Sequence, residues 1–232
     1  IDGSPGLDLR LSAPSAQITK TDAGYTVSAA GETHAVDAVI MAPEPGVAAE
    51  LLSGIIPEAS TKKLRECLYS DYAHVQVCYK SNPWPKHHAS VALPANMERD
   101  WGACVLMSKR QPAGVPAGGE AVGVYFYTPP LEHMSDDAII KSALDAVLEV
   151  YGPAPEPDFV ELFHYRRGLS IADPGHYARL DSLHAEMPPG IYLAGDYFAH
   201  AGVEAAIFSG ELAANRLDAE GRTWFLEANP NP

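Results

Sequence analysis

The stretch that decides the fold is GIYLAGDYFAHAGVEAAIFSGELAAN, residues 190–215. Ile191–Ala194 is a short apolar run of the length and composition of a buried strand. Gly195 and Asp196 end this run, and a turn of small residues follows. The spacing of apolar residues from Val203 to Leu217 predicts a helix. The stretch therefore predicts a tight strand–turn–helix unit.

This unit would bring two kinds of polar group to one place. Asp196 lies at the carboxyl end of the strand, where open α/β sheets hold their ligands, and its carboxylate can accept from a sugar or ribitol hydroxyl. The free N–H groups at the start of the helix favour an anion. The small residues Gly202, Ala206 and Gly210 would let a flat ring approach. A plain structural connection has the same local pattern, so the pattern alone leaves both interpretations open.

A resemblance to a known family favours the ligand site. Residues 190–215 resemble the C-terminal flavin-binding segment of the flavin amine oxidase superfamily, in which a "YLAGD" strand leads into a "VEGAI-SG--AA" helix. Ala205 stands where that family usually has Gly, which would narrow the space for the flavin. Residues 36–43 and the following apolar residues up to Leu52 resemble the family's "aDaVIlA-P--aa-LL" segment. Residues 172–180 resemble a segment of protoporphyrinogen oxidase and carotenoid desaturase relatives.

The resemblance implies an FAD-dependent oxidoreductase that oxidises a hydrophobic or amine-type small molecule by hydride transfer to flavin N5. The residues it implies for cofactor binding are Gly195, Asp196, Tyr197, Gly202, Val203, Glu204 and Ala206. It assigns no catalytic residue. Amine oxidases of the family place an aromatic residue before the last helix, whereas this chain has Ala199–Gly202 there. We therefore expect a relative of protoporphyrinogen oxidase or of the desaturases.

The family's glycine-rich turn for the FAD pyrophosphate, Gly-x-Gly-x-x-Gly between a strand and a helix, is absent from the sequence. We therefore expect a C-terminal fragment, with the N-terminal FAD-binding half supplied in cis or by a second chain. The isolated fragment would then be inactive and hold little or no FAD. Two alternatives stay open: a non-catalytic binding module that has lost the cofactor, and one subunit of a processed or split oxidase.

The expected fold class is α/β (α+β), with an incomplete Rossmann-like FAD-binding domain and a substrate domain built on a mixed or antiparallel sheet. The predicted division is 1–45 for returning β-segments of the FAD-binding domain, 46–170 for the substrate domain, 171–222 for the closing β-turn-α unit and 223–232 for a tail. Predicted strands cover residues 7–11, 17–20, 25–28, 35–41, 73–79 and 123–127. A short helix is expected over residues 46–52.

A longer helix is expected after Ser135, a good N-cap, and should end at Gly152. Its apolar stripe is predicted to be Ile140, Leu144, Val147 and Leu148.

Composition excludes several classes of function. With 16 Lys and Arg against 30 Asp and Glu, the net charge is 16 − 30 = −14, which disfavours nucleic acid and anionic membranes as partners. No apolar run is long enough for a transmembrane segment, and no signal peptide is evident. Three scattered cysteines and no CxxC pair favour a reducing, cytoplasmic setting.

Six other residues are of types that often have a functional role. His87, His88 and His164 lack metal-ligand spacing, so no metal site is expected. His200 suits either an active-site donor or a surface loop. The Arg166–Arg167 pair suits either a substrate carboxylate or a solvated surface.

Overall fold

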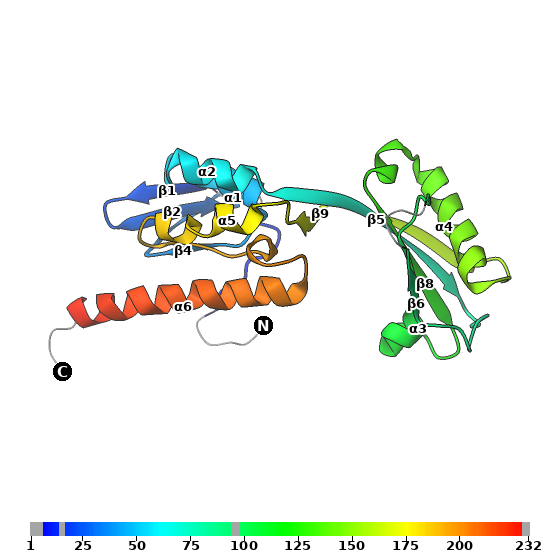
Figure 1. The fold of residues 1–232 in the computed structure, drawn as a ribbon. Helices are drawn as coiled ribbons and strands as arrows, with labels where there is room; N and C mark the ends of the chain where they lie inside the picture. Colours follow the sequence, from blue (N-terminus) through cyan, green and yellow to red (C-terminus); the bar gives the residue numbers. More distant parts are fainter. Residues whose placement is uncertain (1–6, 14–16, 94–97, 229–232) are drawn as a thin grey trace. The chain divides into compact units, whose positions relative to one another are not determined.

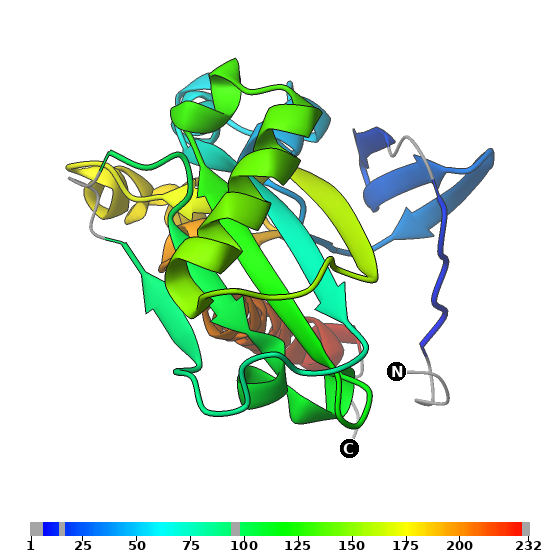
Figure 2. The same ribbon diagram turned by 90° about the vertical axis from the view of Figure 1, so that its right-hand side faces the viewer.

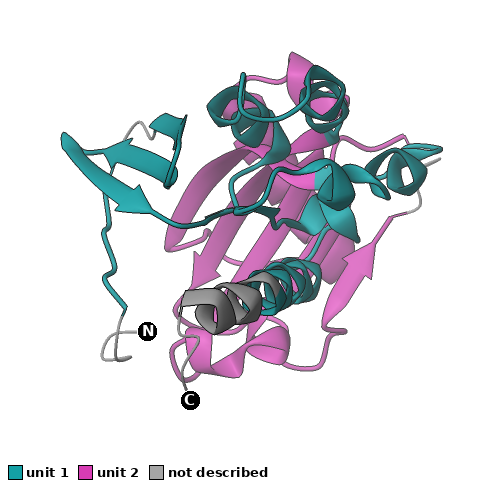
Figure 3. Ribbon diagram, turned by 90° about the vertical axis from the view of Figure 1, so that its left-hand side faces the viewer, with its two compact units in different colours: residues 1–68, 170–232 teal, residues 69–169 magenta. Residues whose placement is uncertain are grey.

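The computed structural model describes residues 7–13, 17–93 and 98–228, with side chains described as far as residue 219. The chain divides into two compact units, residues 1–68 with 170–232 (unit 1) and residues 69–169 (unit 2), coloured separately in Figure 3. Two long strands, β5 (Leu68–Tyr79) and β9 (Phe159–Ile171), carry the chain between the units (Figure 1). The predicted division placed a domain boundary between residues 45 and 46. The first boundary between the compact units lies between residues 68 and 69, so the helices just after residue 45 belong to unit 1. Which unit binds cofactor and which binds substrate stays a prediction.

Unit 1 begins with an antiparallel three-stranded meander. Its strands are β1 (Gln17–Thr21), β2 (Gly24–Ala29) and β3 (Glu32–Val36). The register pairs Thr21 with Gly24, which confirms the predicted hairpin. The predicted strand at residues 7–11 is wrong. No strand is assigned there, and Leu11 is 78% exposed, because an alternating pattern forms a strand only where a partner strand lies beside it.

A second, parallel sheet of unit 1 contains β4 (Val39–Met41) and β10 (Ile191–Leu193). The continuous strand predicted over 35–41 is therefore divided, since its first part pairs with β2 and its last part with β10. Tyr25 holds the two sheets together by donating its hydroxyl to the carbonyl of Pro189, at 2.7 Å. The buried strand predicted at 191–194 is confirmed as β10.

Helices surround the parallel pair of strands. They are α1 (Pro45–Leu51), α2 (Glu58–Arg65), α5 (His176–Leu180), the 3-10 turns η3 (Leu183–Glu186) and η4 (Asp196–Phe198), and α6 (Val203–Ala228). The expected short helix at 46–52 is confirmed as α1. The last helix begins at Val203 as predicted and continues past the expected end at Leu217. Its residues Ala213 and Leu217 pack against Tyr192 and Ala194. The expected tail residues 229–232 lie outside the described part of the chain.

Unit 2 is built on a five-stranded sheet in the order β6-β7-β8-β5-β9. Its other elements are β6 (Ser90–Ala92), β7 (Ala103–Leu106), β8 (Glu120–Tyr127), α3 (Met107–Arg110), η1 (Pro112–Gly114), η2 (Pro130–His133) and α4 (Asp136–Tyr151). The pairings of β6 with β7, β7 with β8 and β5 with β8 are antiparallel. Helix α4 crosses one face of this sheet (Figure 2).

Helix α4 begins and ends where the sequence predicts. The Ser135 hydroxyl accepts from the backbone N–H of Ala138, and Gly152 at the C-cap has φ of 86°, a conformation that glycine adopts without strain. Of the predicted stripe, Val147 is buried and Leu144 packs half-buried against the core, Ile140 is half-buried, and only Leu148, at 48% exposed, is wrong. The buried positions are Ile139, Ala143, Ala146, Val147 and Tyr151. The small residues Ala143 and Ala146 let the helix lie close to the sheet, and this tertiary contact selects the face that is buried.

Strand β5 alternates as predicted. Ala73, Val75 and Val77 are fully buried in the core beneath α4, whereas Tyr72, His74 and Gln76 are half-buried. Successive strand residues point to opposite faces. The half-buried set therefore lies on the sheet face opposite α4. None of the described helices is long and apolar enough to cross a membrane.

Candidate functional site

The turn between β10 and α6 is fixed by hydrogen bonds and by a close approach. The backbone N–H of Gly195 donates to the Ser209 hydroxyl at 2.8 Å, and that hydroxyl donates to the carbonyl of Ala206 at 2.8 Å. A Cβ at Gly195 would lie 2.1 Å from a ring carbon of Tyr197. Only glycine therefore fits at this position without displacement of the ring.

Asp196 follows directly and begins η4. Its half-buried carboxylate accepts from the hydroxyl of Ser170 at 2.9 Å. Ser170 lies 26 residues earlier in the chain, and no local pattern pointed to it. The hydrogen bond orients one carboxylate oxygen, because a carboxylate can accept at both oxygens and needs a fixed donor to hold it.

Tyr197 differs from the other predicted cofactor residues, because its side chain is only 1% exposed. Burial raises the pKa of its phenol. Its hydroxyl has no hydrogen-bond partner among the described residues. Its backbone carbonyl accepts from Nε2 of His176 at 2.7 Å, so this nitrogen carries the proton. Tyr197 thus anchors the turn inside unit 1, and only its backbone lies along the turn.

Segment 172–184 supports the turn, and sequence reasoning gave its residues no role. His176 is buried, and the Tyr177 hydroxyl donates to the carbonyl of Ala199. The ring of His184 stacks on Phe198 with centroids 4.4 Å apart. Burial, helped by the nearby positive charge of Arg216, lowers the pKa of His184 to about 4. The similarity of residues 172–180 to a family segment was the available signal.

The remaining predicted residues are Gly202, directly before α6, and Val203, Glu204 and Ala206 in its first turn, all exposed. The N–H of Ala206 donates to the carbonyl of Gly202 at 3.1 Å. The N–H groups of the three preceding residues have no acceptor within the helix, because a helix leaves its first donors unpaired. Ala205 is 2% exposed. Its methyl group therefore faces the interior of unit 1, whereas the sequence comparison expected it to narrow the flavin space.

The seven predicted residues thus fall within η4, the first turn of α6 and the glycine directly before each of them. Asp196 can accept a hydrogen bond from a hydroxyl group. The exposed N–H groups can donate to an anion. His200, which was not among the predicted cofactor residues, lies between Tyr197 and Gly202 and is exposed. No group of three metal-binding side chains occurs in the parts of the chain that the structure describes.

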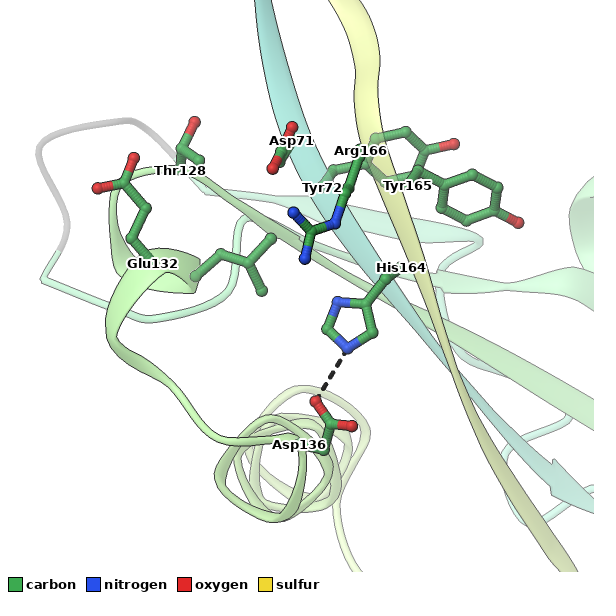
Figure 4. A pocket seen from close by; sticks show the side chains of 9 residues that line it. Asp71, Tyr72, Thr128, Glu132, Asp136, His164, Tyr165 and Arg166 are labelled. Carbon is green, nitrogen blue, oxygen red and sulfur yellow. Dashed lines mark hydrogen bonds and ion pairs between the residues drawn. The ribbon is translucent and has the colours of Figure 1, made fainter. Parts of the chain in front are cut away.

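Unit 2 contains a separate pocket of about 530 Å³ beside the N-terminus of α4 (Figure 4). His164 bonds to Asp136 at 2.9 Å, and the Arg166 side chain extends into the pocket. Glu132 and Asp71 also line it. Within the described residues, Arg166 has no ion-pair partner.

The neighbour of Arg166 has a different environment. The backbone N–H of Arg167 donates to Asp71 at 2.6 Å, and its guanidinium lies 5.5 Å from the centre of the Tyr69 ring. The two arginines considered together in the sequence therefore do not form one site.

Comparisons with known proteins concern the fold and the family of the chain. Solved structures with the same fold include a candidate protoporphyrinogen oxidase from Exiguobacterium sp. 255-15 (20% identity, TM-score 0.75, 90% of this chain and 46% of that one). Another is cyclohexylamine oxidase from Brevibacterium oxydans IH-35A (14% identity, TM-score 0.73, 90% and 48%). At these identities the likeness concerns the fold alone.

Among curated proteins, coproporphyrinogen III oxidase from Mycobacterium tuberculosis is 26% identical over 197 residues. The match covers 83% of this chain and 43% of that protein, so the chain spans less than half the length of this relative. The family model described as flavin containing amine oxidoreductase matches residues 1–218. This chain therefore belongs to the flavin containing amine oxidoreductase family.

Proposed function

We propose that this chain supplies the substrate domain and the closing strand–turn–helix of an FAD-dependent oxidoreductase that acts on a hydrophobic or amine-type small molecule. One observation carries the proposal. The carboxylate of Asp196 and the unpaired N–H groups at the start of α6 lie around the turn that follows β10. Family membership and the names of the relatives support an oxidoreductase.

The residues present fit a flavin nucleotide. A Cβ added at Gly202 or Gly210 would meet no atom within 4 Å, so the outer side of α6 is open to a bulky group. Val203 and Glu204 at the helix tip are exposed. The polar groups also fit a flavin nucleotide, because a carboxylate accepts from sugar-type hydroxyl groups and a helix N-terminus favours negative charge.

In this proposal each residue of the turn has a defined task. Asp196 accepts a hydrogen bond from the ribitol region, and Ser170 keeps the carboxylate in place. The N–H groups of Val203 and Glu204 stabilise negative charge that develops during the reaction, as preorganised donors do elsewhere. FAD, when bound, would supply the acceptor for a hydride from the substrate. Gly195, Tyr197 and Ala206 shape the turn.

Two features of unit 1 support the presence of an N-terminal nucleotide-binding half, in cis or as a second chain. Ala205 and Ala213 are buried on one side of α6, while Val203, Ile207 and Phe208 on other sides are 77%, 59% and 55% exposed. A helix that is apolar all round is normally buried. The sheet of β4 and β10 has two parallel strands, whereas parallel sheets are normally larger and covered on both faces. Unit 1 would then be an incomplete Rossmann-like domain.

The composition of the turn bears on the substrate. Residues 199–202 contain no Phe, Tyr or Trp side chain that could clamp an amine. The similarity to coproporphyrinogen III oxidase also favours a substrate that is not an amine. Within the proposal, a non-amine substrate is therefore preferred over an amine.

The first experiment is an absorption spectrum of the protein purified from its complete gene. We expect flavin bands, which a non-catalytic binding module would lack. A second polypeptide that co-purifies with the flavin would assign the nucleotide-binding half to another chain. A colourless protein that also fails to take up added FAD would overturn the proposal.

The second experiment tests the turn itself. Asp196→Ala in the flavin-loaded protein should weaken FAD retention by at least about tenfold, because hydrogen bonds to charged groups contribute about 1.5–3 kcal/mol. Asp181→Ala is the matched control, because Asp181 is exposed and its substitution removes the same charge. Equal flavin occupancy in the two variants would exclude Asp196 from cofactor binding.

A further inference from the structure

The turn that follows β10 is held in place partly by side chains from α5. We call residues 195–199 the cofactor turn, after the role proposed above. Two N–H groups donate to carbonyls within this turn: that of Phe198 to Gly195 at 3.3 Å, and that of Ala199 to Asp196 at 3.0 Å. These bonds close the turn. They do not fix its position in unit 1, because donor and acceptor both belong to the turn.

Two neighbouring residues of α5 donate hydrogen bonds to the cofactor turn from outside it. Nε2 of His176 donates to the carbonyl of Tyr197 at 2.7 Å, and the hydroxyl of Tyr177 donates to the carbonyl of Ala199. The bonded residues are 21 and 22 positions apart in the chain. The second half of the turn is therefore fixed by a segment that is distant in sequence.

The two donors differ in their exposure to water. His176 is 3% exposed, whereas Tyr177 is 49% exposed. Among the described residues, His176 is the one histidine in the buried class. A hydrogen bond inside the protein is stronger than one that competes with water. The bond from His176 is therefore the firmer of the two constraints on the turn.

The other ring nitrogen of His176 has no comparable contact. Nδ1 is buried and has no hydrogen-bond partner in the described residues. The carboxylate of Asp173 lies 3.8 Å from Nδ1, which is beyond hydrogen-bonding distance, and it accepts two hydrogen bonds from Arg179. A buried polar atom without a partner costs stability, and an apolar side chain would avoid that cost. The bond to Tyr197, and not packing, therefore accounts for a histidine at this position.

The position of the Tyr197 carbonyl affects Asp196, because the two residues are adjacent in the turn. The hydroxyl of Ser170 orients the carboxylate of Asp196 at 2.9 Å. The backbone that carries this carboxylate is fixed one residue later by His176. Without the donor at His176, the carboxylate would keep its bond to Ser170 on a backbone that is free to shift.

We propose that His176 is a positioning residue for the cofactor: through the Tyr197 carbonyl, it keeps the carboxylate of Asp196 where a hydroxyl of FAD can donate to it. His176 itself touches neither cofactor nor substrate and takes no part in the chemistry. The identity of the ligand rests on the proposed flavin function. The effect of His176 on the turn does not, because it involves only residues of unit 1.

The first test measures amide hydrogen exchange in the flavin-free protein expressed from its complete gene. His176→Leu removes the donor, and we expect the amides of the cofactor turn to exchange about tenfold faster, as loss of one buried hydrogen bond allows. His176→Gln should restore the original rate, because Nε2 of glutamine can donate from nearly the same position. Residues 24–36, in β2 and β3 of unit 1, are the internal control and should exchange equally in all three proteins.

A milder variant covers the case in which His176→Leu does not fold. Tyr177→Phe removes one hydroxyl at a half-exposed position and leaves the ring in place. The amides of the turn should then exchange about threefold faster, because a bond that competes with water contributes less. The control residues 24–36 should again be unchanged.

The second test measures the dissociation constant of FAD by fluorescence titration. His176→Leu should weaken FAD binding about tenfold, and His176→Gln should bind FAD as the parent protein does. His34→Leu makes the same replacement at an exposed position of β3 and should leave the affinity unchanged.

Four results would contradict the role of His176. They are equal exchange of the turn in His176→Leu and the parent protein, exchange in His176→Gln as fast as in His176→Leu, equal acceleration of residues 24–36, and faster exchange of the turn with unchanged FAD affinity. A parent protein that binds no FAD would instead overturn the proposed flavin function. The exchange experiment would still decide whether His176 holds the turn.

Discussion

The buried hydroxyl of Tyr197 leads to a prediction about the stability of the folded chain. Tyr197 is 1% exposed, and its hydroxyl has no described hydrogen-bond partner. Burying a hydroxyl without a partner costs about 1–3 kcal/mol in proteins. Tyr197→Phe removes this cost and keeps the ring that packs against Gly195. We expect the free energy of unfolding to rise by about 1 kcal/mol or more.

Tyr25→Phe is the matched control. Tyr25 is 3% exposed in the same unit, and its hydroxyl donates to the carbonyl of Pro189 at 2.7 Å. Loss of that bond should lower the free energy of unfolding by about 1 kcal/mol. The two variants should therefore differ by about 2 kcal/mol, although each loses one hydroxyl group.

The assay is urea unfolding of both variants and the parent chain, followed by far-UV circular dichroism. The slopes against urea should agree, so that the midpoints report stability alone. If Tyr197→Phe proves as destabilised as Tyr25→Phe, the Tyr197 hydroxyl is hydrogen-bonded in solution and the reasoning fails.

Four further predictions concern stability. Gly195→Ala should lower the free energy of unfolding by about 1–3 kcal/mol through the clash with Tyr197. Gly210→Ala, which meets no atom within 4 Å, should be neutral or stabilising in the same urea assay. Glu120→Ala should cost about 3 kcal/mol or more, because this 1%-exposed carboxylate accepts from three neighbouring residues that would lose their acceptor; a chain unchanged in thermal stability would refute this role. The pKa of His184 is lowered to about 4 in the folded chain, so the unfolded chain binds more protons below pH 6.5. The contribution of His184 to stability is therefore complete above pH 6.5 and is lost as the pH falls towards 4. His184→Phe should make the free energy of unfolding depend less on pH between 6.5 and 4, as measured by urea unfolding at several pH values.

Local sequence determined the elements whose interactions are close in the chain. The strand–turn–helix around Asp196, the hairpin ending at Thr21 and Gly24, and the Ser135 cap of α4 all follow from spacing, turn residues and capping. Such features are set by neighbours within a few residues, so a single sequence is sufficient to predict them.

Tertiary structure decided the rest. The buried face of α4 was shifted by about one residue, because packing of Ala143 and Ala146 on the sheet outweighed the larger apolar side chains. The bond from Ser170 to Asp196 spans 26 residues, and the stacked rings of unit 2 combine side chains from β5, β8 and β9. Which strands become neighbours, and in what register, depends on burial over the whole unit, and no local period in the chain contains that information.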